Sequence, residues 1–196
     1  MTDKYSVIYS DPPWRFWAGG DRNATRHYDC MKIDDIAALP VQDWAAEDCA
    51  LFIWVTFPTL QQAFQVIESW GFQYKTCAFA WVKSKKSHNQ HQAAFFPEDN
   101  FDSFMGCGYW TRANVELCLL ATRGKPKRES KSVRQVVFEP IREHSRKPDC
   151  IRNRIVELCG DVPRLEMFAR QKTAGWDVWG NQTEKFKGAE NGENLS

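Results

Sequence analysis

The segment Ala50–Thr56, Ala-Leu-Phe-Ile-Trp-Val-Thr, carries apolar side chains one after another, without the alternation of a half-exposed strand. Such a run is typical of a strand in a sheet that is covered on both faces. It is followed by Pro58–Trp70, in which Leu60, Phe64 and Ile67 have helical spacing. This alternation of apolar strands and helices predicts an α/β fold with a doubly wound, mostly parallel sheet.

The same patterns predict the remaining elements. Strands are expected at Tyr5–Ser10, Thr76–Lys83, Val115–Thr122, Val136–Ile141, Leu165–Ala169 and Trp176–Trp179. Helices are expected at Met31–Leu39, which Pro40 stops, and at Pro148–Leu158. Ligands of such sheets bind beyond the carboxyl ends of the strands, and Asp11, Lys83 and Arg170 are expected just past such ends.

The length of 196 residues fits one domain, which we place at residues 1–182, followed by a flexible tail at residues 183–196. The seven cysteines contain no C-x-x-C pair, which indicates reduced thiols and neither a disulfide framework nor a metal site. Neither a signal peptide nor a membrane-spanning apolar run is evident. We therefore expect a cytoplasmic protein without a membrane partner, and the sequence leaves open whether two copies form a homodimer.

The strand Tyr5–Ser10 ends abruptly at Asp11, Pro12, Pro13 and Trp14. Because proline fixes φ and lacks an N–H group, we expect a rigid loop in which no neighbouring N–H occupies the carbonyls of Asp11 and Pro12. A carboxylate beside a fixed carbonyl can accept both hydrogens of an amino group, and an indole ring can stack on a planar ring. The motif therefore suits the exocyclic amine of a nucleobase. For a bare D-P-P an acidic strand end with a proline turn is the commoner explanation, and the preceding strand and Trp14 favour the binding interpretation.

Basic residues are concentrated in Arg123–Arg154, which holds eleven Lys or Arg against four acids, whereas the formal net charge of the chain is only +1. Such a segment either faces the phosphates of a nucleic acid or is a solvated surface. We expect it to lie near the other site residues. The long polar segments Arg15–Cys30 and Ser84–Arg112 are further candidates for a binding surface.

Taken in order, several motifs resemble those of the D-P-P-W adenine-N6 methyltransferases related to the catalytic subunit of the eukaryotic messenger-RNA adenosine methyltransferase, and in particular their short bacterial and phage members. The resemblance extends over Tyr5–Gln182. The motifs are D-P-P-W at Asp11–Trp14, L-F-I-W-V-T at Leu51–Thr56, W-V-K at Trp81–Lys83, G-Y-W-T-R-A-N-V-E-L-C-L-L at Gly108–Leu120, H-S-R-K-P-D at His144–Asp149, L-E-M-F-A-R at Leu165–Arg170 and W-G-N-Q at Trp179–Gln182.

The resemblance implies a Rossmann-like methyltransferase fold and methyl transfer from S-adenosylmethionine to the N6 atom of adenine in a nucleic acid, with DNA favoured over RNA. It implies that Asp11, Pro12, Pro13 and Trp14 form the catalytic loop. It places Tyr28, Glu116 and Lys147 at the substrate. It further implies that the cofactor is bound by Asp11, Lys147, Glu166, Phe168, Arg170, Asn181 and Gln182.

One departure from the family pattern follows Arg170, where larger members often carry histidine and asparagine and this chain has Gln171, Lys172 and Thr173. Three alternatives to a DNA methyltransferase stay open: the same chemistry on RNA, an inactive nucleic-acid-binding subunit, and a glutamine-amide methyltransferase with a similar proline clamp. The intact acid-proline loop and the Lys147-Pro148 turn favour an active adenine methyltransferase.

Overall fold

The computed structural model describes residues 4–15, 30–84, 106, 110–143 and 145–186. In these residues seven strands form one sheet in the order β5-β3-β4-β2-β1-β6-β7. The strands are β1 (Tyr5–Ser10), β2 (Ala45–Val55), β3 (Gln73–Ser84), β4 (Val115–Arg123), β5 (Val136–Pro140), β6 (Arg164–Met167) and β7 (Asp177–Trp179). The helices are α1 (Ile33–Ala37), α2 (Val41–Trp44), the short 3-10 helix η2 (Phe57–Thr59), α3 (Leu60–Ser69) and α4 (Cys150–Cys159). The prediction of a mostly parallel α/β sheet is confirmed.

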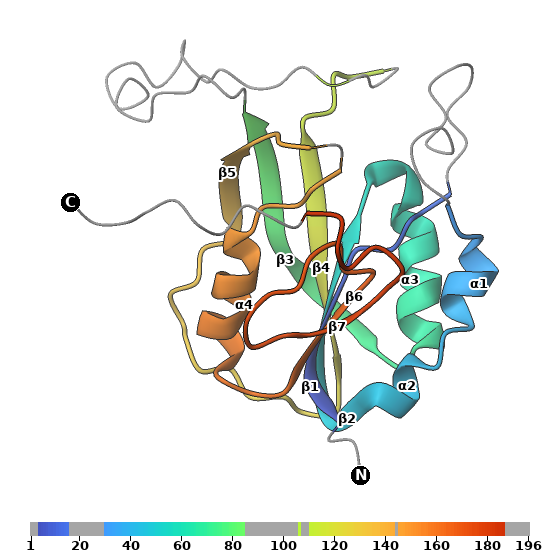
Figure 1. The fold of residues 1–196 in the computed structure, drawn as a ribbon, viewed down its shortest axis with the longest axis vertical. Coiled ribbons are helices and arrows are strands. Elements are labelled where there is room, and N and C mark those ends of the chain that lie inside the picture. The colour runs from blue at the N-terminus through green and yellow to red at the C-terminus, as the bar shows by residue number, and fades with distance from the viewer. Residues whose placement is uncertain (1–3, 16–29, 85–105, 107–109, 144, 187–196) are drawn as a thin grey trace.

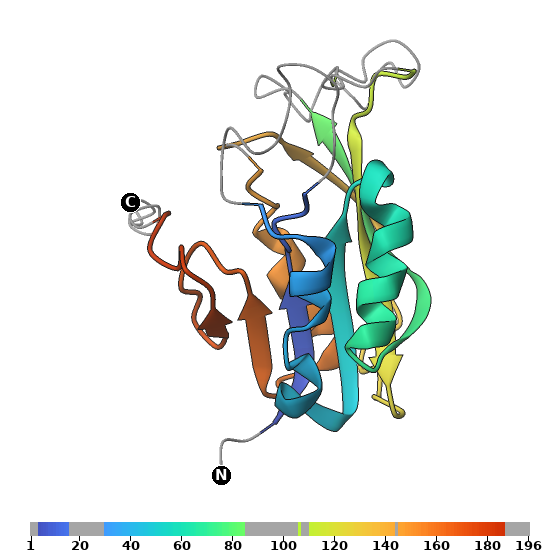
Figure 2. The same ribbon diagram turned by 90° about the vertical axis from the view of Figure 1, so that its right-hand side faces the viewer.

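Strand β4 is the exception to the parallel arrangement. Four of the six strand pairings within the described residues are parallel, and the two that involve β4, with β2 and with β3, are antiparallel. Figure 2 shows β4, in yellow, running against the direction of the other strands. The amino-terminal end of β4 therefore lies at the same edge of the sheet as the carboxyl ends of β1, β2 and β3, and we call this edge the site edge.

Helices cover both faces of the sheet (Figure 1). On one face, α1 and α3 contribute Ile36, Ala63 and Val66 to a core that also contains Ile8 and Leu51 of the sheet. On the other face, α4 packs Ile151 and Ile155 against residues such as Phe52, Phe79 and Val137. Because β2 is covered on both sides, its residues from Cys49 to Val55 are all buried, as the continuous apolar run predicts.

Several element boundaries differ from the predictions; β2 and β3, for example, begin earlier than expected, at Ala45 and Gln73. The helix expected at Met31–Leu39 is shorter, and a second short helix, α2, begins directly after Pro40. The strand expected at Leu165–Ala169 ends at Met167, because Phe168 has a φ of 57°, outside the range of a strand. Lys83 lies within β3 and not past its end.

The basic segment Arg123–Arg154 divides into two parts. Strand β4 carries the chain away from the site edge, so that the backbone N–H of Lys125 donates to Asp48 near the start of β2, at 2.7 Å. The exposed residues of this part, Lys125, Lys127 and Arg128, form what we call the far-edge basic cluster. The length of a strand separates this cluster from the site, about 20 Å for the six steps along β2 from Cys49 to Val55. The expectation that the whole basic segment lies beside the site is therefore wrong for the far-edge basic cluster.

The predicted tail is described as far as Phe186, whose backbone N–H donates to the carbonyl of Arg170 at 3.1 Å. The guanidinium of Arg146 lies 4.8 Å from the centroid of the Phe186 ring. Residues 187–196, and most of Arg15–Cys30 and Ser84–Arg112, lie outside the described residues, so the domain boundary stays a prediction. In the described part of the chain, no helix has the length and apolar character needed to cross a membrane.

Candidate active site at the carboxyl edge of the sheet

The loop after β1 presents Asp11 at the site edge and fixes its neighbours by hydrogen bonds. The backbone N–H of Trp14 donates to the carbonyl of Pro12 at 2.8 Å, and the indole N–H of Trp14 donates to the carbonyl of Trp54 at 2.8 Å. The expectation that no neighbouring N–H occupies the Pro12 carbonyl is therefore wrong, because the loop closes a γ-turn. One lone pair of that oxygen still remains for a ligand.

Trp14 is 4% exposed and belongs to the core on the α1 and α3 side of the sheet. Its ring contributes to the wall of a small pocket beside Asp11. Its indole N–H is already bonded, so any contact with a ligand is through the ring. That Trp14 stacks on a substrate base stays a prediction.

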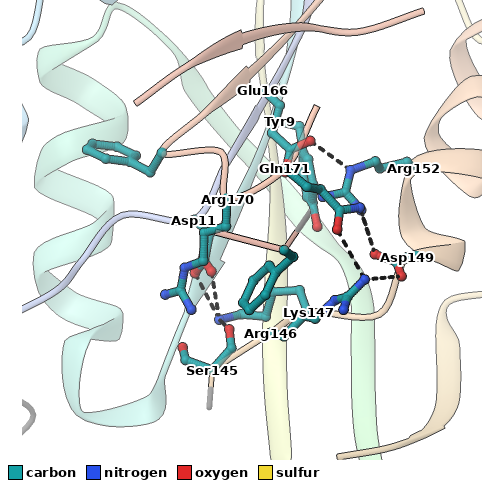
Figure 3. A pocket seen from close by; sticks show the side chains of 12 residues that line it. Tyr9, Asp11, Ser145, Arg146, Lys147, Asp149, Arg152, Glu166, Arg170 and Gln171 are labelled. Atoms are coloured by element: carbon teal, nitrogen blue, oxygen red, sulfur yellow. Dashed lines mark hydrogen bonds and ion pairs between the residues drawn. The ribbon is translucent and has the colours of Figure 1, made fainter. Parts of the chain in front are cut away.

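Lys147 lies at the centre of the site. Its Nζ is 2.9 Å from Oδ1 and 3.0 Å from Oδ2 of Asp11 (Figure 3). The same Nζ is 3.3 Å from Oε2 of Glu116. The ammonium also lies 5.6 Å from the ring centroid of Trp54, a cation–π distance. A single cation thus joins an acid that follows β1 to an acid in β4.

Glu116 is the second residue of β4, and it reaches the site because that strand is reversed. Its Oε1 atom is 2.5 Å from Nζ of Lys83, on the neighbouring strand β3. Burial raises the pKa of Glu116, but the ammonium groups of Lys147 and Lys83 lower it by more, so that the net pKa is below the ordinary value. The carboxylate is therefore ionised at neutral pH and satisfied on both oxygens.

The same balance holds Lys147 in its charged form. Burial lowers the pKa of Lys147, but the carboxylates of Asp11 and Glu116 raise it by more, and the net pKa lies well above the ordinary value. Lys147 therefore serves as a permanent cation in this site, and it is not a proton acceptor at neutral pH.

Three cavities meet at Asp11 and Arg170, and both residues line each of them. The largest has a volume of about 530 Å³, within the range of small-molecule sites. The second, about 40 Å³, lies between Asp11, Trp14 and Glu116, and the third, about 30 Å³, lies beneath Lys147 toward α4. Asp11 thus lies between the large cavity and the two small ones.

The large cavity brings together residues from three strand ends. Its wall includes Phe168 after β6 and Trp179 in β7, whose rings make an edge-to-face contact with centroids 5.2 Å apart. Gly180, Asn181 and Gln182, which follow β7, also line this cavity. A Cβ atom at Gly180 would lie 3.1 Å from both the Cα of Phe168 and the backbone N of Ala169. Only glycine lets the G-N-Q turn approach β6 so closely.

The carboxylate of Glu166, another predicted cofactor residue, is bonded on both oxygens by a single arginine. Arg152 of α4 donates from Nε to Oε2 and from Nη2 to Oε1, both at 2.7 Å. Burial raises the pKa of Glu166, and the hydrogen bonds from Arg152 oppose that rise. Glu166 lines the cavity beneath Lys147 and not the large one.

The structure thus brings most of the predicted site residues to one edge of the sheet. Asp11, Pro12, Trp14, Glu116, Lys147 and Arg170 line the small pocket, and Asp11, Pro13, Phe168, Arg170, Asn181 and Gln182 line the large cavity. Tyr28 lies outside the described residues. Their roles toward a bound substrate or cofactor stay predictions. Within the described ranges, no cluster of three or more His, Cys, Asp or Glu could hold a metal ion.

The sequence analysis did not identify the polar residues that support Lys147 on the α4 side of the site. Arg152, Asp149, Arg146 and Gln171 form a hydrogen-bonded network below Lys147 (Figure 3). One signal was available: Glu166 lies in an apolar strand, and a buried acid requires a basic partner. Which of the many basic residues supplies it depends on how α4 packs on the sheet.

Comparison with known proteins identifies the family of this chain. The sequence profile of the MT-A70 family matches residues 5–182. The chain is 31% identical over 200 residues to the Type II methyltransferase M.MunI of Mycoplasma sp, a match that covers 90% of this chain and 77% of that protein. It is 28% identical to the N(6)-adenosine-methyltransferase MT-A70-like protein of Arabidopsis thaliana and 26% identical to the catalytic subunit METTL3 of Homo sapiens, each over 91% of this chain. These matches cover 24% and 28% of the two eukaryotic proteins, so the chain spans about a quarter of their length. The chain belongs to the MT-A70 family of adenine-N6 methyltransferases.

Proposed function

We propose that this chain transfers a methyl group from S-adenosylmethionine to the N6 atom of adenine in DNA. The observation that carries the proposal is the ion-paired centre in which Lys147 joins Asp11 to Glu116, at the point where the large cavity meets the small pocket. A methyl donor and an acceptor base must meet at one point, and Asp11 lines both spaces.

The residues of the large cavity fit the cofactor. Phe168 and Trp179 offer apolar ring surface for an adenine ring, and the amides of Asn181 and Gln182 suit ribose hydroxyls. Arg170 and Asp11 offer opposite charges for the carboxylate and ammonium of the amino-acid end. When bound, the cofactor supplies a methyl group on a sulfonium centre.

The chain's own residues orient and activate the amine. An ionised carboxylate has about four acceptor positions. Lys147 occupies one on each oxygen of Asp11, so acceptor capacity remains for an N–H of the substrate amine. The free lone pair of the Pro12 carbonyl can take the second hydrogen. Two acceptors on these hydrogens favour a pyramidal nitrogen with its lone pair available, and the charge of Asp11 stabilises the positive charge that develops there.

The choice of DNA is supported by the Mycoplasma relative, which is named a Type II methyltransferase and not an adenosine methyltransferase, and which matches most of the length of both chains. The eukaryotic relatives are named for adenosine methylation, which keeps RNA as the second candidate substrate. In a DNA duplex the N6 atom is paired, so the target base must leave the stack or be presented in a single strand. An inactive subunit is the weakest alternative, because Asp11 and Lys147 are intact and in contact.

Three further expectations accompany this proposal. The sheet, with helices on both faces, is a variant of the Rossmann-like methyltransferase fold in which β4 is reversed. The Mycoplasma relative favours the cytoplasm of a bacterial or phage-infected cell as the place of action. Two copies forming a homodimer would be detected by light scattering of the purified protein.

The proposal is tested with labelled S-adenosylmethionine on three oligonucleotides of one sequence: duplex DNA, single-stranded DNA and single-stranded RNA. We expect label in N6-methyladenine of at least one DNA substrate, identified by mass spectrometry after digestion. The matched control is Asp11→Asn, which keeps the shape of the side chain and removes its charge. If label is found in RNA alone, the substrate is RNA and not DNA. If no adenine-containing oligonucleotide is labelled, the proposed activity is rejected.

A further inference from the structure

We propose that Asp149 is a positioning residue for methyl transfer: acting through Arg142 and Arg146, its carboxylate fixes the turn that holds Lys147 against Asp11. The inference rests on the proposed function, and it concerns a residue that contacts neither substrate nor cofactor but positions Lys147. Asp149 immediately precedes α4, two residues after Lys147.

The turn that carries Lys147 needs external support. Ser145 has a φ of 59°, a left-handed conformation that is uncommon for a residue other than glycine and that persists only where neighbouring contacts enforce it. The lysine side chain is long and flexible, yet its Nζ lies within 3.0 Å of both oxygens of Asp11. That placement requires a fixed backbone at Lys147.

Asp149 supplies the fixed point for this backbone. Its Oδ2 atom accepts hydrogen bonds from Nη1 of Arg142 at 2.6 Å and from Nη2 of Arg146 at 3.1 Å. Arg142 then uses its second nitrogen, Nη2, to donate to the backbone carbonyl of Lys147 at 3.0 Å. Asp149 therefore reaches Lys147 through one planar guanidinium, whose two donors have a fixed geometry.

The other oxygen of Asp149 ties the turn to the rest of the site. Oδ1 accepts hydrogen bonds from Nη1 of Arg152 at 2.9 Å and from Nε2 of Gln171 at 3.4 Å. Gln171 follows Arg170, and its Oε1 atom accepts a second hydrogen bond from Arg146 at 3.1 Å. Gln171 stands where larger family members often carry another residue, and here it links the lysine turn to the end of β6 (Figure 3).

Charge makes Asp149 hard to replace. Three guanidinium groups, of Arg142, Arg146 and Arg152, contact this single carboxylate. Burial raises its pKa, but these groups lower it by more, which shows that they favour the ionised form. Without the negative charge the three cations repel one another, and the link from Arg142 to the Lys147 carbonyl loses its anchor.

The experiment is a double-mutant cycle between Asp149→Asn and Lys147→Met, with kcat and KM measured for methyl transfer. We expect Asp149→Asn to lower kcat by about 100-fold, the loss that a displacement of about 1 Å can cause in an active site. In the Lys147→Met background, Asp149→Asn should cause no further loss, because the residue acts through Lys147. If the two losses multiply instead, Asp149 acts independently of Lys147 and the proposal is overturned.

A second readout needs no activity. The ammonium resonance of Lys147 in a ¹H–¹⁵N NMR spectrum, assigned by its disappearance in Lys147→Met, should be sharp in the wild type because Asp11 and Glu116 hold the group. Asp149→Asn should broaden or remove it, and an unchanged resonance would overturn the proposal. If the wild-type chain transfers no methyl group to any substrate, the proposed function fails, and this resonance alone decides the positioning role.

The control variant is Asp161→Asn, which removes an ion pair with Arg164 of the same i,i+3 spacing at the other end of α4. It should leave kcat and the Lys147 resonance unchanged. If Asp149→Asn does not fold, Arg142→Lys takes its place, because a lysine keeps the charge but cannot bridge Asp149 and the Lys147 carbonyl with a planar fork. A resonance and a kcat unchanged in Arg142→Lys would overturn the proposal equally.

Discussion

The ion pair between Arg152 and Glu166 gives the sharpest test of the energetics behind the site. We consider Glu166→Gln, which keeps the size of the side chain and removes its charge. The wild-type pair has two hydrogen bonds of 2.7 Å, and its side chains are only 11% and 8% exposed. The substitution leaves the Arg152 guanidinium buried beside a neutral amide.

The magnitude follows from this geometry. Removing one partner of a buried ion pair costs about 3–5 kcal/mol, because the other charge stays behind without compensation. Arg152 keeps its bond to Asp149 at 2.9 Å, which places the expected loss in the free energy of unfolding near the lower limit, at about 3 kcal/mol. For a chain of this length such a loss lowers Tm by roughly 10 °C.

Urea denaturation and thermal unfolding, each followed by circular dichroism, measure this loss. The matched control is again Asp161→Asn, whose carboxylate side chain is 93% exposed and whose loss should not change stability measurably. If the free energy of unfolding of Glu166→Gln lies within about 1 kcal/mol of the wild-type value, the pair does not stabilise the fold as the geometry indicates.

Calorimetry with S-adenosylhomocysteine on the same variant addresses the second predicted role of Glu166. Unchanged affinity would assign the residue to the ion pair, and a loss of about tenfold or more, equal to about 1.4 kcal/mol, would make it a cofactor ligand as well.

Four further outcomes are expected. Asp11→Ala should abolish methyl transfer in the labelled-cofactor assay while the chain still folds, because Lys147 keeps Glu116 as a partner; turnover at the wild-type rate would contradict the assigned centre. S-adenosylhomocysteine should raise Tm by mass action, and Asn181→Ala should reduce this shift; an equal shift in both proteins would remove Asn181 from the cofactor site. Because the pKa of Glu116 is lowered in the folded state, its contribution to stability is present above its ordinary pKa of 4.5 and is lost as the pH falls through the lower folded value. Glu116→Gln should therefore flatten the fall in stability below about pH 4.5, as measured by urea denaturation across pH. Charge reversal of the far-edge basic cluster should leave the KM for DNA and its salt dependence unchanged, and a flatter salt dependence would show that DNA reaches this edge.

The sequence predicts the elements of this fold well where a pattern is strong and local. The apolar run in β2 indicates its burial on both faces, and the acid after Tyr5–Ser10 indicates the site edge. The spacing of Leu60, Phe64 and Ile67 predicts helix α3, in which Ile67 is buried and Leu60 and Phe64 are half-buried. The other buried residues of α3, Ala63 and Val66, are not among the predicted ones. These features depend on residues close together in the chain.

The network behind Lys147 could not be predicted in the same way. Asp149 contacts residues on α4, on the preceding turn and after β6, and only the packing of α4 on the sheet brings them together. From the sequence, Arg142, Arg146 and Arg152 are three of eleven basic residues in one segment. The charge of that segment suggested a phosphate-binding surface, whereas the structure uses these three arginines as internal partners of Asp149.

The direction of β4 is the feature that most affects the site, because it brings Glu116 to the edge of the sheet where Asp11 and Lys147 lie. About 30 residues separate β3 from β4, which is enough for a parallel crossover as well as for an antiparallel return, so connection length does not decide the direction. A parallel β4 would carry its second residue to the edge opposite Asp11, away from Lys83 and Lys147. Burying a carboxylate without a partner costs several kcal/mol, and in the observed direction both lysines pair with Glu116. The reversed strand is therefore the arrangement in which an acid within an apolar strand finds two lysines, and the same ion pairs that stabilise it build the centre where methyl transfer is proposed.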